Sequence, residues 1–410
     1  MTKISRTRIC RTVDRLVGEL EELGLAMNRA GSGNGAECVI NGERYKNFGS
    51  CSYMGLERHP RLLAGAHAAL DEFGTQFSFS RAYLDSPLYL ALEDALDRLA
   101  GRRVMVAPST TLAHLAALPV LVGEQDAVLI DQFAHASLHM ATELLKGNPI
   151  ERVRHNRMDL LEEKITKHAA SAERIWYICD GVYSMLGDFA DFDGLESLLQ
   201  RYPQLHIYID DAHAISWCGE SGRGAALGRL GHCDRVIVAM SLNKAFAAAG
   251  GAIALPSDEL RSRVRRCGGP MLFSGPIQPP MLGAALASAE LHLAPTFAAL
   301  QDELAQRISV AELAIARHGL RVANNARTPI FMVQFEAPKS LYRALYALRS
   351  RGYYCCVSTF PAVPVDKPSL RFTVTRHNAV DEIEQFIEHL ADVVHTPQPE
   401  QSATIVGHPC

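Results

Sequence analysis

Short apolar runs alternate with stretches of helical periodicity through the middle of this 410-residue chain, and this alternation most limits how it can fold. The apolar runs lie at residues 104–107, 128–130, 175–179, 207–209, 236–240 and 252–255. Short apolar runs separated by helical patterns are typical of strands in a mostly parallel, doubly wound sheet. The sequence therefore predicts an α/β fold built on one large sheet.

Two of these predicted strands end in chemically useful side chains. The fourth run is followed by Asp210 and His213, and the fifth is followed by Ser241 and Lys244. Because ligands bind outside the carboxyl ends of strands in open α/β sheets, these side chains should meet at one crevice. A lysine for a Schiff base and an aspartate to hold a proton on the pyridine nitrogen are what pyridoxal phosphate (PLP) requires. The pattern predicts a PLP site.

Each of these residues also has a plainer interpretation. A lysine is usually a solvated surface residue, but Lys244 is the only charged residue between Arg235 and Asp258. Its neighbours are alanines, a phenylalanine and glycines, and a desolvated amine has a lowered pKa, which favours the neutral nucleophile that Schiff-base chemistry requires. Asp210 and Asp211 could instead cap a helix or bind Mg²⁺. No phosphate loop of the GxxxxGK[ST] type precedes them, so we rank the metal site low and predict none.

Polar residues follow two more of the predicted strands. Ser109, Thr110 and Thr111 come after the first run, where hydroxyls and free backbone amides at a helix N-terminus could seat a phosphate or simply cap the helix. His135 follows the second run and is a candidate to stack on a flat cofactor ring, although a lone histidine is more often structural.

Two later residues complete the set of candidates. Asp180 follows the third run. Arg371 lies in a predicted strand at 370–374, where its guanidinium could anchor a carboxylate or be a surface charge.

Composition limits the possible functions. Hydrophobic residues make up 48% and charged residues 21% of the chain, as in ordinary globular proteins. The net charge of −4 gives no electrostatic case for nucleic acid or anionic membranes. The apolar runs stop well short of the roughly 18–20 residues of a membrane helix. The N-terminus lacks the apolar core of a secretory signal. The ten cysteines are scattered without a CxxC pair, which is typical of reduced thiols. We therefore expect a cytoplasmic protein.

The order of the patterns predicts four segments. We expect an N-terminal helix and linker at 1–48, a large domain at 49–290, a small C-terminal domain at 291–395 and a disordered tail at 396–410. A long helical pattern at 284–316 is expected to link the two domains as one spine.

Taken in chain order, the motifs resemble the α-oxoamine synthases, a family of fold type I PLP enzymes. The resemblance covers about residues 48–378 and rests on 180–185 (Asp-Gly-Val-Tyr-Ser-Met), 210–213 (Asp-Asp-Ala-His), 219–224 (Gly-Glu-Ser-Gly-Arg-Gly), 241–244 (Ser-Leu-Asn-Lys) and 272–274 (Leu-Phe-Ser). It implies a doubly wound, mostly parallel seven-stranded sheet with a smaller α+β C-terminal domain, and PLP as cofactor.

The resemblance also implies a role for each matching residue. Lys244 would form the Schiff base and move protons, Asp210 would bind the pyridine nitrogen, and His213 would bind the phenolic oxygen. His135 would stack on the ring, and Arg371 would bind the carboxylate of the amino acid. The implied cofactor-binding set is Ser109, Thr110, Thr111, His135, Asp180, Ser184, Asp210, His213, Ser241, Lys244 and Ser274.

The implied reaction joins an amino acid to an acyl thioester with loss of CO₂ and release of the thiol, giving an α-amino ketone. Ser274 would reach the phosphate of a neighbouring subunit, which implies a homodimer with shared sites. The thioester carrier, coenzyme A or an acyl-carrier protein, stays open. An aminotransferase or lyase of the same fold and a non-catalytic partner subunit are the alternatives.

The chain departs from the family pattern in two loops. Cys51 stands where many members have an asparagine that helps to hold the substrate carboxylate, and the usual glycine-rich segment is replaced at 80–87 (Ser-Arg-Ala-Tyr-Leu-Asp-Ser-Pro). We therefore add Cys51 and Arg81 to the candidate substrate-binding residues. These loops are more similar to members that make specialised metabolites or signal molecules.

Overall fold

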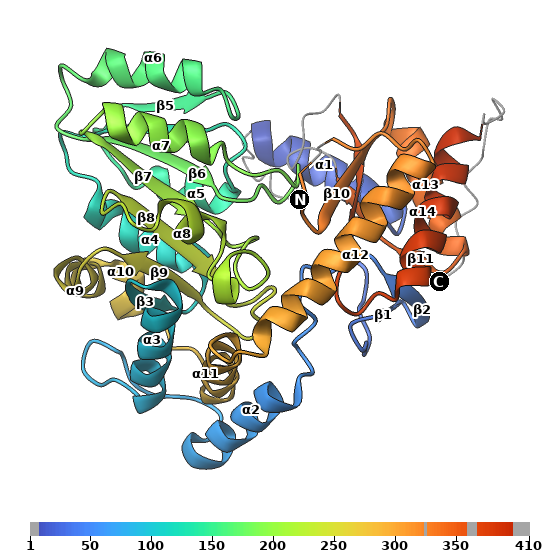
Figure 1. The fold of residues 1–410 in the computed structure, drawn as a ribbon, viewed down its shortest axis with the longest axis horizontal. Helices are drawn as coiled ribbons and strands as arrows, with labels where there is room; N and C mark the ends of the chain where they lie inside the picture. Colours follow the sequence, from blue (N-terminus) through green and yellow to red (C-terminus); the bar gives the residue numbers. More distant parts are fainter. Residues whose placement is uncertain (1–7, 324–325, 359–366, 397–410) are drawn as a thin grey trace, which may run out of the picture. The chain divides into compact units, whose positions relative to one another are not determined.

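The computed structural model describes residues 8–323, 326–358 and 367–396 (Figure 1). The chain forms two compact units. The larger unit comprises Cys51–Ser184 and Asp188–Leu304, and the smaller comprises Met1–Ser50, Met185–Gly187 and Ala305–Cys410. Of the predicted disordered tail, residues 397–410 lie outside the described residues.

A seven-stranded sheet forms the centre of the larger unit (Figure 1). Its spatial order is β3-β9-β8-β7-β6-β4-β5. β9 runs antiparallel to β3 and β8, and the other neighbouring pairs are parallel, which confirms the predicted mostly parallel sheet. The strands are β3 (Arg103–Ala107), β4 (Ala127–Asp131), β5 (Ile150–Val153), β6 (Ile175–Asp180), β7 (Leu205–Asp210), β8 (Val236–Ser241) and β9 (Gly251–Leu255).

The central strands were recognisable because they are buried on both faces. Every residue of β4, β6, β8 and β9 is buried, and doubly covered parallel strands appear as continuous apolar runs. β5 is the exception, since its Ile-Glu-Arg-Val sequence is only partly buried and it lies at the edge of the sheet. No apolar run marks it, and the sequence analysis missed it.

Helices cover both faces of this sheet (Figure 1). α4 (Thr110–Leu121) packs with α5, α9 and α10 on the face to which Tyr208 of β7 points. α7 (Phe192–Arg201) packs with α6 and α8. The other helices of the unit are α2 (Pro60–Phe73), α3 (Pro87–Ala100), α5 (Ala136–Thr142), α6 (Met158–His168), α8 (Ala225–Leu230), α9 (Asp258–Cys267), α10 (Gly269–Phe273) and α11 (Pro279–His292), with a short 3₁₀ turn at Glu220–Gly222.

The helical pattern at 284–316 forms two helices instead of one spine. α11 ends at His292, and α12 (Phe297–Arg317) begins after a turn that contains Pro295. Proline ends or kinks a helix because it lacks a backbone N–H and its ring crowds the preceding turn. The two units meet in the sequence within α12, between Leu304 and Ala305, which is later than the boundary expected after residue 290.

The smaller unit contains two three-stranded sheets, β1-β2-β11 and β10-β13-β12. The N-terminal segment belongs to it because β2 pairs with β11 and the hydroxyl of Tyr346 donates to the carbonyl of Leu23 at 2.5 Å. Among the described helices, none has the length and apolar character that crossing a bilayer requires. The elements are α1 (Arg8–Glu22), β1 (Glu37–Ile40), β2 (Glu43–Asn47), β10 (Ile330–Gln334), α13 (Pro338–Ser350), β11 (Tyr353–Tyr354), β12 (Cys356–Ser358), β13 (Ser369–Thr373) and α14 (Val380–His395).

Candidate active site

A cavity of about 150 Å³ lies at the carboxyl ends of β6, β7 and β8 in the larger unit. Asp180, Asp210 and Ser241 are the last residues of these three strands, and all of them line it. Parallel strands bring such residues to one edge of the sheet. The full lining is Ser109, Thr110, Thr111, His135, Ser137, Asp180, Asp210, Ala212, His213, Ser241, Asn243 and Lys244.

The carboxylate of Asp210 is held at two points. Its Oδ1 accepts from the backbone N–H of Ala212 at 3.0 Å, and its Oδ2 lies 3.0 Å from Nε2 of His114. The other ring nitrogen of His114 lies 2.9 Å from the hydroxyl of Tyr208. Tyr208 and Asp210 point to the same face of β7 because side chains alternate along a strand, and α4 brings His114 to that face. These contacts fix the orientation of the Asp210 carboxylate.

A second buried acid, Asp180, lies close enough to Asp210 for their charges to interact. Burial raises the pKa of Asp180 well above its usual range, and the charge of Asp210 adds to this rise. Burial alone would also raise the pKa of Asp210, but His114, Lys244 and His135 lower it well below its usual range. The negative charge of the pair therefore resides on Asp210.

His135 caps the N-terminus of α5 at the edge of the cavity. Its backbone N–H donates to Asp180 at 2.9 Å, and its Nδ1 lies 2.7 Å from the hydroxyl of Ser137. Desolvation by the surrounding protein lowers the pKa of the imidazole, Asp210 opposes this, and Lys244 adds to it. The loss of charge suits a ring that stacks on another ring.

His213 is buried, and its Nδ1 lies 2.8 Å from the hydroxyl of Tyr53. Its backbone carbonyl accepts from the indole of Trp217 at 2.6 Å. The first contact orients the imidazole and the second holds the backbone of His213, which lines the cavity together with Asp210.

The hydroxyl cluster lies at the N-terminus of α4, as expected. The Oγ of Ser109 accepts from the backbone N–H of Leu112 at 3.2 Å, which makes Ser109 the cap of the helix. β9 approaches closely here: a Cβ on Gly251 would lie 2.4 Å from the backbone nitrogen of Thr110. A glycine is therefore required beside the first turn of α4, where free amides can receive an anion.

Lys244 is half-buried and lies in the loop between β8 and β9, called here the Lys244 turn. The turn closes through Leu242 N–H to the carbonyl of Gly250 at 3.0 Å and Ala247 N–H to the carbonyl of Lys244 at 2.9 Å. The side chain of Asn243 accepts from Gly250 N–H at 2.7 Å. The backbone that presents the amine to the cavity is therefore well defined.

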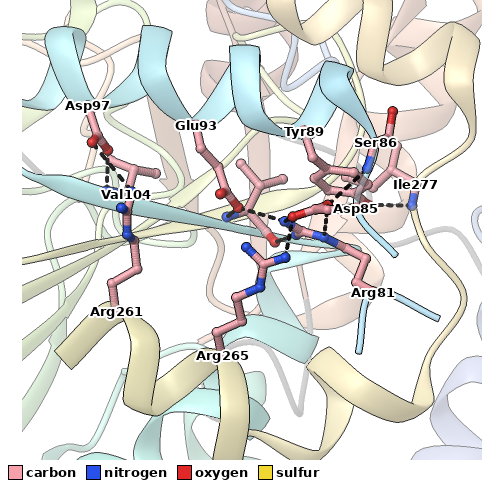
Figure 2. Close-up of polar contacts among 11 residues, drawn as sticks. Arg81, Asp85, Ser86, Tyr89, Glu93, Asp97, Val104, Arg261, Arg265 and Ile277 are labelled. Atoms are coloured by element: carbon pink, nitrogen blue, oxygen red, sulfur yellow. Dashed lines mark hydrogen bonds and ion pairs between the residues drawn. The ribbon is translucent and has the colours of Figure 1, made fainter. Parts of the chain in front are cut away.

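Arg81 lies in a network of polar contacts (Figure 2). It is outside the described lining of the cavity. Its guanidinium donates to Asp85 at 3.0 Å, to Glu93 at 3.1 Å and to the carbonyl of Val106 at 2.9 Å. The guanidinium also stacks on Tyr89, with its Cζ 3.7 Å from the centroid of the ring. Three structural acceptors engage the side chain, and the expected substrate contact of Arg81 stays a prediction.

The other predicted residues lie outside the described lining of this cavity or in the smaller unit. Ser184 and Cys51 are half-buried residues of the larger unit, and the hydroxyl of Ser274 donates to the carbonyl of Pro270. Arg371 is buried in β13, the middle strand of a sheet in the smaller unit, opposite Met332 of β10.

The sequence analysis missed His114, Ser137 and Asn243. Ser137 and Asn243 lie two and one residues from the recognised His135 and Lys244, so their position in a loop after a strand was a usable signal. His114 offered only a single imidazole in an apolar helix, which is more often a core histidine. Among the described residues, no group of three or more His, Cys, Asp or Glu side chains is arranged to hold a metal ion.

Comparison with known proteins gives a consistent result. The family model for aminotransferase class I and II matches residues 44–390. The chain is 31% identical to an 8-amino-7-oxononanoate synthase from Stutzerimonas stutzeri over 88% of this chain and 91% of that protein. It is 26% identical to a serine palmitoyltransferase from Sphingobacterium spiritivorum over 87% and 88%. The structure of Sphingomonas wittichii serine palmitoyltransferase superposes on this chain with a TM-score of 0.84 at 23% identity. The match covers 94% of this chain and 98% of that one, so the two chains share a fold.

Proposed function

Because the chain belongs to the α-oxoamine synthases of the aminotransferase class I and II family, we propose that Lys244, Asp210 and their neighbours bind PLP and condense an amino acid with an acyl thioester. The enzyme is a PLP-dependent acyltransferase, and its product is an α-amino ketone formed with loss of CO₂. The observation that carries the residue assignment is the convergence of Lys244 and the charged Asp210 on one cavity.

The residues around the cavity fit PLP group by group. The ionised Asp210 can accept a hydrogen bond from the pyridine N–H, and the buried His213 can donate to the phenolic oxygen. The amides and hydroxyls of Thr110 and Thr111 can receive the phosphate, and Gly251 lets β9 approach the backbone of Thr110 closely without displacing this first turn of α4. When bound, PLP supplies an electron sink for negative charge at the α-carbon of the amino acid.

The protein's own groups then divide the work. The amine of Lys244 would hold the cofactor, and it would also be the base that removes the α-proton of the amino acid and returns it. Asp210 keeps a proton on the ring nitrogen because it stays ionised beside His114. His135 would stack on the ring and orient the acyl group, and the hydroxyl of Ser137 contacts its Nδ1 and holds the imidazole.

We assign the substrate carboxylate to Arg371. Its side chain is buried, and a guanidinium in that setting is preorganised for a planar anion. Cys51 remains a candidate for the same substrate. An anchored carboxylate would fix the orientation of the amino acid at its α-carbon.

We propose a homodimer on the basis of exposed apolar side chains near Ser274. Phe273 is 88% exposed, and Tyr83 and Leu84 are 87% and 60% exposed. The two segments form one surface because the hydroxyl of Ser80 donates to the carbonyl of Leu272 at 2.8 Å. Large exposed apolar patches usually mark interaction sites, and a second subunit would also bring Ser274 to its neighbour's phosphate. Phe273→Asp should then yield monomers with weakened PLP binding, measured by light scattering and cofactor titration.

We also propose a cytoplasmic location. The eight cysteines whose side chains are described are free thiols, which suits a reducing compartment.

Exchange of the α-proton tests the proposed function. Purified protein with PLP is incubated in D₂O with a panel of amino acids, and then with acyl-coenzyme A or acyl-carrier protein while free thiol is measured. We expect rapid exchange for the true amino substrate and thiol release with at least one carrier. Formation of pyridoxamine phosphate with a keto acid, without thiol release, would favour the aminotransferase alternative.

A further inference from the structure

Three buried polar side chains outside the cavity contact the turn that carries Lys244. The hydroxyl of Ser216 lies 3.1 Å from the carbonyl of Ala245, and the hydroxyl of Ser288 donates to the carbonyl of Phe246 at 2.7 Å. His292, one helical turn after Ser288 on α11, places its Nε2 2.7 Å from the hydroxyl of Ser216. The two backbone carbonyls that directly follow Lys244 are therefore both held by side chains.

This cluster is part of the core. The side chains of Ser216, Ser288 and His292 are fully buried. The imidazole of His292 packs against the rings of Phe246 and Phe297, whose centroids lie 4.6 and 3.9 Å from its own. A buried polar group is costly unless it is hydrogen-bonded, so hydroxyls and an imidazole at this depth need a reason beyond packing.

α11 is a firm support for these contacts. It crosses α2 so closely that a Cβ on Gly283 would lie 2.2 Å from the carbonyl of Gly65. Backbones in such close contact leave little room for the helix to shift. Ser288 and His292 are therefore presented to the Lys244 turn from a fixed element.

The hydrogen bonds of the cluster hold Ser216 in one place. Burial lowers the pKa of His292 to about 4, although the carbonyl of Ser288 opposes this, so the ring carries one hydrogen at neutral pH. That hydrogen belongs on Nδ1, which faces the carbonyl of Ser288 at 2.7 Å. The hydroxyl hydrogen of Ser216 is then shared between two acceptors, Nε2 of His292 and the carbonyl of Ala245. If the side chain rotated away, both acceptors would lose this donor.

The backbone at this contact is strained on both sides. Ser216 has φ of 81° and Ala247 has φ of 62°, a region that favours glycine. Strain of this kind persists only where the surrounding structure enforces it, and it is concentrated at functional sites. A glycine at position 216 would relieve the strain but would lose the hydroxyl.

We propose that Ser216 and Ser288, supported by His292, are positioning residues that hold the backbone after Lys244 so that its amine projects into the cavity. The proposal rests on the proposed function, in which Lys244 is the attachment point for PLP. Both serines lie outside the described lining of the cavity, and their hydroxyls would act through the backbone of residues 245 and 246.

The rate at which PLP attaches to Lys244 tests this role. In attachment, the amine nitrogen bonds to the aldehyde carbon, two amine hydrogens leave with the aldehyde oxygen as water, and a C=N bond remains. The wild type, Ser216→Gly and Ser288→Ala are stripped of cofactor and mixed with PLP, and attachment is followed by absorbance. Borohydride reduction and mass spectrometry then locate the modified lysine.

Thr142→Val is the matched control. The hydroxyl of Thr142 is buried and donates to the carbonyl of His139 at 2.8 Å, a bond of the same kind as that of Ser288, away from the described cavity lining. We expect attachment to slow about 5- to 10-fold in Ser216→Gly and Ser288→Ala, the size of one lost hydrogen bond, and to stay within about twofold of wild type in the control. In Ser216→Gly, relief of the backbone strain should offset part of the stability that is lost when Nε2 of His292 and the carbonyl of Ala245 lose their donor.

Attachment within about twofold of wild type in both serine variants would overturn the positioning role while leaving the proposed function intact. Slowing in Thr142→Val equal to that in Ser288→Ala would overturn it too, because it would reflect general destabilisation. A wild-type chain that attaches no PLP would refute the proposed function, and this inference with it.

Discussion

Nε2 of His114 lies 3.0 Å from Oδ2 of Asp210, and both side chains are almost completely buried. A carboxylate can only accept, so the hydrogen of this bond is on the imidazole. The hydroxyl of Tyr208 can then donate to the other ring nitrogen, 2.9 Å away. Tyr208, His114 and Asp210 form a chain of hydrogen bonds that ends at the acid assigned to the ring nitrogen of PLP.

Replacing His114 by phenylalanine should destabilise the cofactor-free protein by about 1–3 kcal/mol at neutral pH, because a buried carboxylate loses a donor. The pKa of Asp210 is lowered in the folded state, against the effect of burial and chiefly by His114. Its stabilising contribution is therefore fully present above the unfolded pKa of about 4 and is lost as the pH falls from there toward the lower pKa of the folded state.

Urea unfolding across this pH range measures the effect. The difference between wild type and His114→Phe should shrink as the pH falls, while Tyr208→Phe, which keeps the bond to Asp210, should cost less. A difference between wild type and His114→Phe that does not depend on pH would contradict the account.

Gly251→Ala should weaken PLP binding about 10- to 100-fold, the range for a lost hydrogen bond to a charged group. The new Cβ would lie 2.4 Å from the backbone nitrogen of Thr110 and displace the first turn of α4. Cofactor titration followed by absorbance gives the dissociation constant. Gly228→Ala is the control, because a Cβ there meets nothing within 4 Å. Unchanged affinity for PLP in Gly251→Ala would refute the assigned phosphate site.

His155 predicts a loss of stability at alkaline pH. Burial alone would lower the pKa of its imidazole, but Asp131 and Asp188, with contacts of 3.3 and 2.8 Å, raise it to about 9. A pKa raised on folding gives stability that is fully present below the unfolded value of about 6.5 and is lost as the pH rises through about 9.

His155→Gln should therefore be less stable than wild type by about 1–3 kcal/mol near pH 6, with a smaller difference near pH 10. Denaturant unfolding at both pH values checks this. His232→Gln, at a side chain that is 67% exposed, should change little at either. Equal effects of the two substitutions would contradict the ion-pair account.

Arg81→Met should destabilise the protein by about 3–5 kcal/mol, because Glu93 and Asp85 would be left without their buried partner. The side chain of Arg81 is only 6% exposed, and Arg265 from α9 contacts Asp85 as well but not Glu93 (Figure 2). Arg98→Met removes a pair with Asp94 whose side chains are 61% and 75% exposed, and should cost less than about 1 kcal/mol. Thermal or urea unfolding distinguishes the two, and a small loss in Arg81→Met would show that the network is not structural.

The sequence predicted the central sheet and most of the cavity for one physical reason. Doubly buried strands appear as apolar runs, and the residues that follow them meet at one edge, so Asp210 and Lys244 could be paired without a structure. The same reasoning found Asp180 and His135. It failed at β5, whose exposed edge position leaves no apolar run.

Contacts between distant side chains could not be read in this way. His114 and Asp210 are 96 residues apart, and only the packing of α4 on β7 joins them. Arg81 was assigned to substrate because its loop differs from the family pattern, but its acceptors on α3 and β3 became visible only in three dimensions. The break at Pro295 was different, since the proline was a readable signal that the long helical pattern concealed.

Turnover by Lys244→Ala tests the central claim most directly. The variant and the wild type are supplied with PLP, the amino acid that exchanges its α-proton and the acyl thioester, and free thiol is measured over time. We predict a folded variant whose thiol release falls by about 1,000-fold or more, because both the attachment point and the base are lost. Thiol release at a rate near that of the wild type would contradict the assignment of Lys244 and the reaction built on it.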